Sequence, residues 1–392
     1  MYIPEDRLND ILSEVAKKRN LKRWRYICKN SMDAIENYFG VLVPATINGT
    51  KTDKSEDDLT LHLLIKITPN NIERRMKQVF KYLFETETFL YTILRPKFCN
   101  LSVVNMDGLI PNCYYTDLDP EKQVIVLQDM TFEGYHRYTG QRFLDFDHLV
   151  VALKALAKFH AVSLILVEKG NVSDINNVIA PYTDTDPVEL NITLKLALKN
   201  HHKYFSGTKY EKYLKSLLSR YSSVRLDSFQ KARRLICGHG DYWKENILFK
   251  YKENKPDQAC IIDFQTLRFL SPSQDFLSFI LVSTDGTTRS SHYEVLMTTY
   301  IEAVTDILAS INENLAKSFI DDFKHDLNVV ADNCLITSFM SFALWYGLEE
   351  ETLLLSKNKT DKNIAIINFT ETIRSAIDDL ERLRYITIDT NA

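Results

Sequence analysis

The chain has 392 residues, of which 45% are hydrophobic and 26% charged, and its formal net charge is -4 at pH 7. This length favours two lobes or domains, and this composition is typical of a folded protein and excludes a largely disordered one. The small negative charge provides no broad cationic face, so we expect no nucleic-acid partner.

Signals for secretion, membrane insertion and cysteine-based sites are missing from the sequence. Acidic residues, Glu5 and Asp6, stand where a signal peptide has positive charge, and no apolar run reaches the roughly 18 residues of a spanning helix. The 6 cysteines form no CxxC pair, which argues against a zinc site or a disulfide framework. We therefore expect a cytoplasmic protein with no membrane attachment, and nothing implies a protein partner.

The N-terminal third alternates between helical and strand patterns. Residues 5–37 begin with apolar residues at helical spacing and predict an amphipathic helix. Residues 40–48 and 59–67 are apolar or alternating runs, joined by a turn region, and predict a hairpin that leads into a further strand. Residues 72–92 again have helical periodicity, and we expect this helix to end before Pro96.

The pattern becomes mainly helical after one more short apolar strand at residues 123–130. The segment from Asp145 to Gly170 has acids at its start, apolar residues along its length and a glycine at its end, so it predicts the central helix of a second lobe. Residues 187–221 and 290–383 also predict helices. The order of elements indicates an α+β fold with its lobe boundary at the strand 123–130.

Two motifs between the helical blocks indicate phosphoryl transfer. His239, Asp241 and Asn246 have the spacing H-x-D-x-x-x-x-N of a kinase catalytic loop, and Asp263 follows an apolar strand. Phosphoryl transfer needs a carboxylate that orients the attacking hydroxyl, and oxygen ligands for Mg²⁺. We assign the first role to Asp241 and the metal-ligand role to Asn246 and Asp263. The alternative is that the aspartates cap turns or helices.

A lysine upstream supplies a further charged group of such a site. Lys66 lies in an apolar strand, where an unpaired ammonium would be costly, so we expect Glu87 on the following helix to pair with it. Glu85 is close enough in sequence to be confused with Glu87. The alternative is that Lys66 lies at a strand edge and extends its ammonium into water.

Two residues near the catalytic motif have expected supporting roles. His239 precedes Asp241 by two residues, and we expect its imidazole to hold the loop by hydrogen bonds, although a general base is the alternative. Asp275 begins the helical pattern that follows, and we expect it to hold the loop from there; a simple helix N-cap is the alternative.

The sequence resembles the ecdysteroid kinase-like, or CHK kinase-like, family of the choline and aminoglycoside phosphotransferase superfamily. Besides the two motifs above, the resemblance includes Glu36-Asn37-Tyr38, Leu64-Ile-Lys66-Ile-x-Pro69, Glu87-x-x-x-Tyr91, Val126-Leu-Gln128-Asp129-Met130 and Leu156-Ala-Lys-Phe-His160-Ala-x-Ser163. It implies a bilobal protein-kinase-like fold, with a small N-terminal lobe of antiparallel sheet plus helix (1–127), a hinge (128–133) and a large, mainly α-helical C-terminal lobe (134–392). It also implies ATP and Mg²⁺ as cofactors, and transfer of the γ-phosphate to a hydroxyl of a steroid or xenobiotic alcohol.

The chain departs from the family pattern at two places that bear on the nucleotide: the nucleotide loop, and the hinge, where the usual Leu-Glu-Asp-Leu is Leu127-Gln128-Asp129-Met130. The nucleotide loop of the family usually reads Gly-Glu-Asn, whereas this chain has Ile-Glu-Asn ending at Asn37, with Gly40 the nearest glycine. We retain Asn37 as a nucleotide contact, and Gln128 and Met130 of the hinge as adenine contacts. The altered loop supports an alternative function, a catalytically silent pseudokinase that binds a small hydrophobic ligand or nucleotide.

The same motifs argue for a small-molecule acceptor and against a protein substrate. Gly240 stands where protein kinases have an arginine that senses a phosphorylated activation loop, and no Ala-Pro-Glu segment follows Asp263. We expect helices of the second lobe to border the acceptor, with aromatic candidates that also fit a purely structural role in the core. These candidates are Trp243, Phe279, Trp345 and Tyr346.

Overall fold

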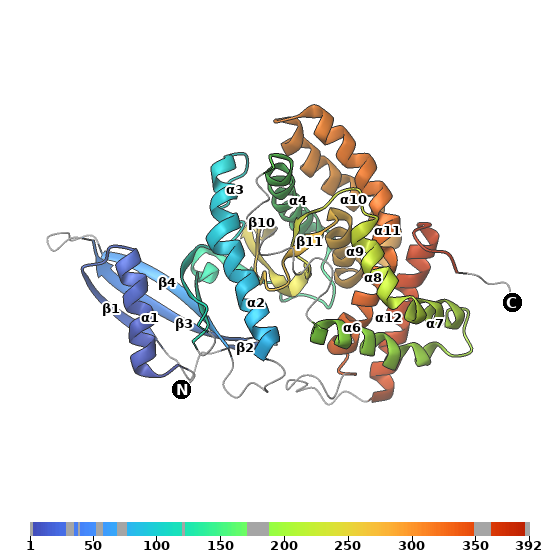
Figure 1. The fold of residues 1–392 in the computed structure, drawn as a ribbon, viewed down its shortest axis with the longest axis horizontal. Coiled ribbons are helices and arrows are strands. Elements are labelled where there is room, and N and C mark those ends of the chain that lie inside the picture. The colour runs from blue at the N-terminus through green and yellow to red at the C-terminus, as the bar shows by residue number, and fades with distance from the viewer. Residues whose placement is uncertain are drawn as a thin grey trace.

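The structure is a computed structural model of the chain. It describes residues 3–28, 35–37, 40–51, 58–68, 77–119, 122–170, 188–348 and 362–388. A smaller N-terminal part built on a β-sheet lies beside a larger, mainly helical part (Figure 1). This two-part arrangement is the α+β, protein-kinase-like architecture that the sequence predicts.

The N-terminal sheet is antiparallel, with strand order β1-β3-β4-β6-β5 and with β2 paired to β3. The elements of this part are α1 (Glu5–Lys18), β1 (Arg23–Cys28), β2 (Ile35–Asn37), β3 (Gly40–Thr50), β4 (Asp58–Ile67), β5 (Cys113–Asp117) and β6 (Val124–Gln128). The apolar stripe of α1 packs on one face of the sheet, and Leu12 and Val15 share a buried cluster there with Ile65 and Ile67 of β4. Because side chains alternate along a strand, Lys66 between them faces the opposite side.

The helix predicted over residues 5–37 is shorter than expected. It ends at Lys18, and Asn20 has a left-handed backbone (φ 57°) that turns the chain into β1. β1 alternates exposed and half-buried side chains, and in the described sheet it is an edge strand paired with β3. Neither face of such a strand is fully buried, so its sequence does not show the clear alternation of apolar and polar residues from which a strand is predicted.

The helix after β4 also differs from its predicted end. It comprises α2 (Lys77–Phe89), a π-helical turn (Leu90–Leu94) and α3 (Arg95–Leu101), so it continues past Pro96. Pro96 is tolerated because it stands in the first turn of α3, where the wider π turn precedes it and a missing backbone N–H costs little. Residues 69–76, where the predicted helix would begin, lie outside the described part of the chain.

The larger part is built around α4 (Phe146–Glu168), which begins at the N-cap Asp145 as predicted. Its remaining elements are η3 (Met130–Glu133), β7 (Tyr135–Arg137), α6 (Val188–His201), η5 (His202–Phe205), α7 (Glu211–Ser219), α8 (Tyr221–Gln230), β8 (Ile236–Gly238), η6 (Lys244–Asn246), β9 (Ile247–Lys252), β10 (Lys255–Ile261), β11 (Arg268–Leu270), α9 (Pro272–Ser283), α10 (Gly286–Ala309), α11 (Glu313–Trp345) and α12 (Lys362–Arg382). There are two small sheets, β10-β9-β7 and β11-β8, and the motif residues lie beside the ends of their strands: His239 follows β8, Asn246 precedes β9, and Asp263 comes shortly after β10.

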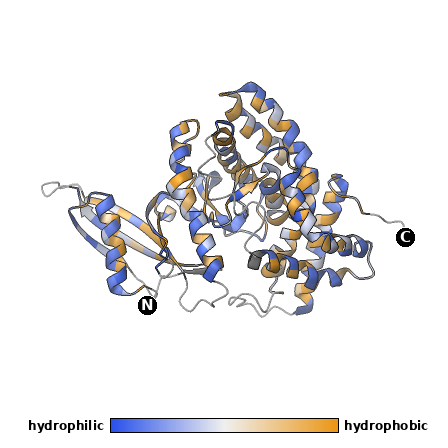
Figure 2. Ribbon diagram, in the orientation of Figure 1, coloured by the Kyte–Doolittle hydropathy of each residue, from blue (hydrophilic) through white to orange (hydrophobic). Residues whose placement is uncertain are grey.

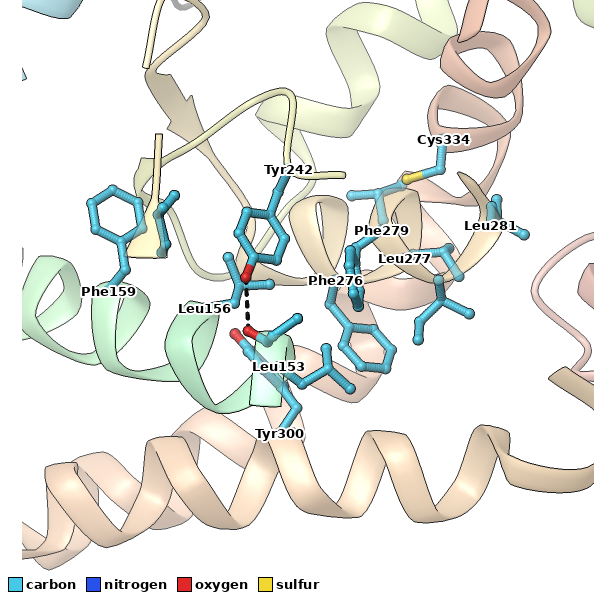
Figure 3. Packing of buried hydrophobic residues seen from close by; sticks show 14 of the residues in the cluster. Leu153, Leu156, Phe159, Tyr242, Phe276, Leu277, Phe279, Leu281, Tyr300 and Cys334 are labelled. Atoms are coloured by element: carbon cyan, nitrogen blue, oxygen red, sulfur yellow. Dashed lines mark hydrogen bonds between the residues drawn. The ribbon is translucent and has the colours of Figure 1, made fainter. Parts of the chain in front are cut away.

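The core of the larger part is formed where α4, α9, α10 and α11 meet. Figure 3 shows Leu153 and Leu156 of α4 close to Phe276 of α9, all of them fully buried. Tyr242, next to Asp241 in sequence, is 2% exposed and donates a hydrogen bond of 2.7 Å to the carbonyl of Ala152. This contact ties the segment with the catalytic motif to the central helix.

Two helices of this part are long and apolar enough to span a membrane by composition, so the expectation that no segment qualifies is wrong by that measure. They are α4 and α11, whose most apolar windows are 72% and 61% buried inside the structure. Figure 2 shows apolar residues gathered toward the interior of the larger part, with hydrophilic residues on its outer helices. Burial in the protein core accounts for the composition of both helices.

Candidate active site

A lysine and two carboxylates from distant segments meet between the two parts. Lys66 Nζ lies 2.6 Å from Glu87 Oε2 and 2.8 Å from Asp263 Oδ1. The side chains of Lys66 and Glu87 are 3% and 1% exposed, and that of Asp263 is 27% exposed. The predicted Lys66–Glu87 pair is therefore present, and the alternative that Lys66 extends into water is wrong.

The electrostatics of this group favour a charged lysine. Burial lowers the pKa of Lys66, but the carboxylates of Asp263 and Glu87 together outweigh it, so the pKa of Lys66 is raised above its usual value. Burial raises the pKa of Glu87 to about 7 despite the opposing ammonium. The ammonium thus has one deeply buried partner and one partner that is open to the space between the two parts.

The catalytic motif forms a short turn whose ends are joined by a side chain. Asn246, the last residue of η6, donates from Nδ2 to the backbone carbonyl of Asp241 at 2.9 Å and to its carboxylate Oδ2 at 3.0 Å. Asp241 has exposed surface, but protein groups surround its carboxylate. This desolvation, followed by the nearby charge of Asp263, raises the pKa of Asp241 to about 7, against hydrogen bonds from Asn246 and Trp243.

Asp275 holds the beginning of this turn. Its Oδ2 accepts from the backbone N–H of His239 at 2.6 Å, and its Oδ1 accepts from that of Gly240 at 2.9 Å. Burial acts to raise the pKa of Asp275, but the hydrogen bond and charge of His160, with further contributions, lower it overall. Ser271 is the residue that caps α9, so the alternative that Asp275 is a simple N-cap is wrong.

His239 uses both ring nitrogens within the protein. Its Nδ1 lies 3.3 Å from the backbone N–H of Asp241, and its Nε2 lies 3.0 Å from the carbonyl oxygen of Ile262. An N–H needs an acceptor and a carbonyl needs a donor, so this is the neutral tautomer with its proton on Nε2. Burial lowers the pKa of His239 and favours the same neutral form. The geometry fits the predicted supporting role better than the alternative of a general base.

Two backbone positions in the motifs have left-handed conformations. Gly240 has φ 81°, and a Cβ there would lie 2.3 Å from the carbonyl oxygen of Thr266, so only glycine fits without displacing the chain. Asp263 has φ 64°, an unusual conformation for a residue with a side chain, directly after the strand β10 and Ile262. This strained turn directs the Asp263 carboxylate to Lys66.

His160 is a supporting residue that the assignment of individual sites missed. It lies on α4, 1% exposed, with Nε2 at 3.1 Å from Asp275 Oδ2 and Nδ1 at 2.7 Å from the hydroxyl of Tyr300. The sequence signal is a histidine within the apolar face of a core helix, where a buried imidazole needs partners. The identity of those partners depends on how α9 and α10 pack on α4.

The predicted nucleotide contacts are placed as follows. Asn37 pairs through its backbone with Gly40, and its side chain lies outside the described part of the chain. Gln128 ends β6, and its side chain accepts from Asn112 Nδ2 at 2.8 Å and donates to Glu133 Oε1 at 3.0 Å. Met130 is buried in a small cluster together with Tyr135, Leu248 and Cys260.

The four aromatic candidates for the acceptor site divide into two groups. Phe279 is fully buried in the core, and Tyr346 is 7% exposed with its hydroxyl bonded to Arg142 and Thr372. Trp243 and Trp345 are half-buried, and their rings lie 6.1 Å apart beside the catalytic motif. The prediction for Phe279 is therefore wrong, because its ring faces the core.

The residues present fit a magnesium site only in combination with a nucleotide. In the described ranges, no group of three His, Cys, Asp or Glu residues could hold a metal by itself. Asp263 and Asn246 offer two oxygen ligands, and Mg²⁺ in kinases takes its remaining ligands from phosphates and water. This set matches the hard-oxygen chemistry that Mg²⁺ requires.

The profile described as "Ecdysteroid kinase-like family" matches residues 34–313. Among solved structures, an ethanolamine kinase from Plasmodium vivax is 12% identical (TM-score 0.44) over 93% of this chain and 83% of its own. A choline kinase from Cryptosporidium parvum is 13% identical (TM-score 0.46) over 96% and 98%, and one from Streptococcus pneumoniae is 11% identical (TM-score 0.39) over 96% and 100%. Similarity at this level carries no conclusion about the reaction, and no curated protein matches significantly.

Proposed function

The chain belongs to the ecdysteroid kinase-like family, and from this premise we propose that it is an ATP- and Mg²⁺-dependent small-molecule kinase. It transfers the γ-phosphate to a hydroxyl of a steroid or xenobiotic alcohol. The observation that carries the proposal is the position of the Lys66 ammonium, 2.6 Å from Glu87 and 2.8 Å from Asp263. A lysine between these two carboxylates is the arrangement that kinases use to bind nucleotide phosphates beside a metal.

Each residue of the site has a part in the proposed reaction. Asp241 orients the acceptor hydroxyl and takes its proton, for which a pKa raised to about 7 suits a base that works near neutral pH. Asn246 and Asp263 bind Mg²⁺, and Lys66 binds phosphate oxygens while Glu87 holds its ammonium in place. The bound Mg²⁺-nucleotide supplies the phosphoryl group and neutralises its charge.

The nucleotide is proposed to lie between an N-terminal lobe (1–127) and a C-terminal lobe (134–392), with the hinge (128–133) against adenine. Support for this position of adenine comes from Met130, which forms a buried apolar cluster with Leu248 and Cys260 next to the proposed hinge. Asn37 and Gln128 complete the proposed nucleotide contacts. We also propose that the protein works in the cytoplasm, without a nucleic-acid, membrane or protein partner.

A panel of steroid and xenobiotic alcohols, incubated with ATP and Mg²⁺ and analysed by mass spectrometry, tests this function. The expected result is a product heavier by one phosphoryl group, formed only with Mg²⁺ present. If no alcohol is phosphorylated and ATP with Mg²⁺ gives no thermal stabilisation at millimolar concentration, the alternative of a catalytically silent binding protein replaces the proposal. A nucleotide at 100 times its Kd should stabilise the fold by about 2.7 kcal/mol.

A further inference from the structure

Three aromatic side chains lie close to one another beside Asp241, the proposed catalytic carboxylate. Trp243 follows Asp241 by two residues and donates a hydrogen bond to its carboxylate. The ring of Trp345, at the end of α11, lies 6.1 Å from that of Trp243 and 5.8 Å from that of Phe143. All three side chains are half-buried, and we call them the aromatic wall. An alcohol oriented by Asp241 therefore has its carbon skeleton next to this wall.

The aromatic wall already has cations of the chain itself against it. Lys244 Nζ lies 4.9 Å from the ring centre of Trp345, and Arg142 Cζ lies 5.7 Å from the same centre. Arg142 also lies 4.4 Å from the ring of Tyr346 and donates to its hydroxyl at 2.6 Å. The ring of Trp345, which would attract a cationic ligand, thus already has two cations of the chain beside it.

The charges around these cations are not balanced. The carboxylate of Glu245 pairs with two of the nearby cations. Its Oε1 lies 3.4 Å from Lys244 Nζ, and its Oε2 lies 3.7 Å from the guanidinium of Arg137. The side chain of Lys244 is only 11% exposed, so its charge is poorly screened by water. Arg137 and Lys244 therefore share one carboxylate, whereas Arg142 donates to the hydroxyl of Tyr346 and has no carboxylate partner among the described contacts.

We infer that the acceptor is a flat, apolar alcohol that carries a negative group, with its rings on the aromatic wall and the negative group near Lys244 and Arg142. This inference rests on the proposed function and deepens it, because it gives the charge of the acceptor. A quaternary ammonium alcohol is disfavoured for two reasons: Lys244 and Arg142 already lie beside the ring of Trp345, and these cations repel it.

Tryptophan fluorescence measures this binding without requiring catalysis. The chain has 3 tryptophans, and Trp24 lies on the N-terminal strand β1, so Trp24→Phe leaves a signal from Trp243 and Trp345 only. The probes are para-(hydroxymethyl)benzoate, its carboxamide and its trimethylammonium analogue, which share one ring and one alcohol. The expected affinity order is benzoate, then carboxamide, then trimethylammonium, with about a fivefold step between the first two, as for a single partly exposed ion pair.

Lys244→Gln should remove most of the difference in affinity between the benzoate and the carboxamide, while both probes still bind. Lys250→Gln is the matched control, since Lys250 also lies over an aromatic ring, that of Tyr135 at 5.5 Å, but on β9. Arg142→Gln is a second variant that should reduce the same step. Thermal melting of each variant verifies that it is folded.

The outcomes separate this inference from the proposed function. If the trimethylammonium probe binds as tightly as the benzoate, or if Lys244→Gln leaves the step unchanged, the inference is wrong, whether or not the protein phosphorylates alcohols. If the predicted affinity order appears but no acceptor is phosphorylated in the mass-spectrometry panel, the charge preference stands and the kinase function fails.

Discussion

Replacing Asp275 with asparagine should destabilise the larger part of the protein and displace the catalytic turn. The carboxylate is 2% exposed and accepts from the backbone N–H groups of His239 at 2.6 Å and Gly240 at 2.9 Å. His160 Nε2 approaches the same group at 3.1 Å. One side chain therefore satisfies three buried donors.

The size of the effect follows from the change in acceptors. Asparagine keeps one oxygen, so the N–H of either His239 or Gly240 faces an amide NH₂ group. A buried donor without an acceptor costs about 1–3 kcal/mol, and the bonds that remain lose about 1 kcal/mol when the negative charge is removed. We expect Asp275→Asn to lower the free energy of unfolding by roughly 2–4 kcal/mol.

Urea unfolding of wild type and variant measures this loss as a shift of the midpoint. Asp285→Asn is the matched control: Asp285 caps α10 and accepts from the backbone N–H of Thr288 at 2.7 Å at the surface. Asparagine is nearly as good an N-cap as aspartate, so this control should change stability by only a few tenths of a kcal/mol. If Asp275→Asn is no more destabilising than Asp285→Asn, the interpretation that Asp275 holds the turn is refuted.

Three further changes test the site and its electrostatics. Asp241→Asn should reduce phosphate transfer by roughly a hundredfold to ten-thousandfold while ATP affinity stays nearly constant, and full activity in the variant would exclude Asp241 as the base. Gly240→Ala should lower the free energy of unfolding in urea by about 2 kcal/mol more than Gly207→Ala does. Both glycines have positive φ, but only at Gly240 would a Cβ meet a carbonyl oxygen, at 2.3 Å. Equal losses of stability in the two variants would contradict this explanation. Burial lowers the pKa of His239 and His201 below 6.5, so both histidines contribute a fall in stability as pH drops below about 6.5, whereas Glu87 and Asp241, with pKa values raised to about 7, contribute a rise over the same range. His239→Asn should remove its share of that fall in a pH series of urea unfolding, with His201 leaving part of it, and an unchanged slope would show that His239 is not responsible.

The sequence predicts elements best where apolar periodicity is strong. The helix from Asp145 to Gly170 matches α4 closely because one whole face of it is buried and its cap residues are standard. The edge strand β1 and the passage of the helix through Pro96 were missed. Both depend on neighbours, β3 in one case and a π-helical turn in the other, that local spacing does not encode.

The same limit divides the site residues. The spacing of the motifs was enough to select Lys66, Glu87 and Asp263, which the fold brings together. It was not enough for His160, because its partner Asp275 lies 115 residues away along the chain. It also left Phe279 as a candidate for the acceptor site with a core role as the alternative, and the full burial of its side chain on α9 supports the core role.

Lys66 itself helps to specify the register of the N-terminal sheet. Ile65 and Ile67 on either side of it are buried in the cluster that α1 covers, at 0% and 2% exposure. A slip of β4 by one residue would exchange the faces, so that the ammonium would enter this apolar cluster and two isoleucines would face Glu87 and Asp263. Burying an unpaired ammonium costs several kcal/mol or forces its deprotonation, so the slipped sheet is strongly disfavoured. The lysine that the proposed reaction requires therefore also favours the only register in which it can reach both carboxylates.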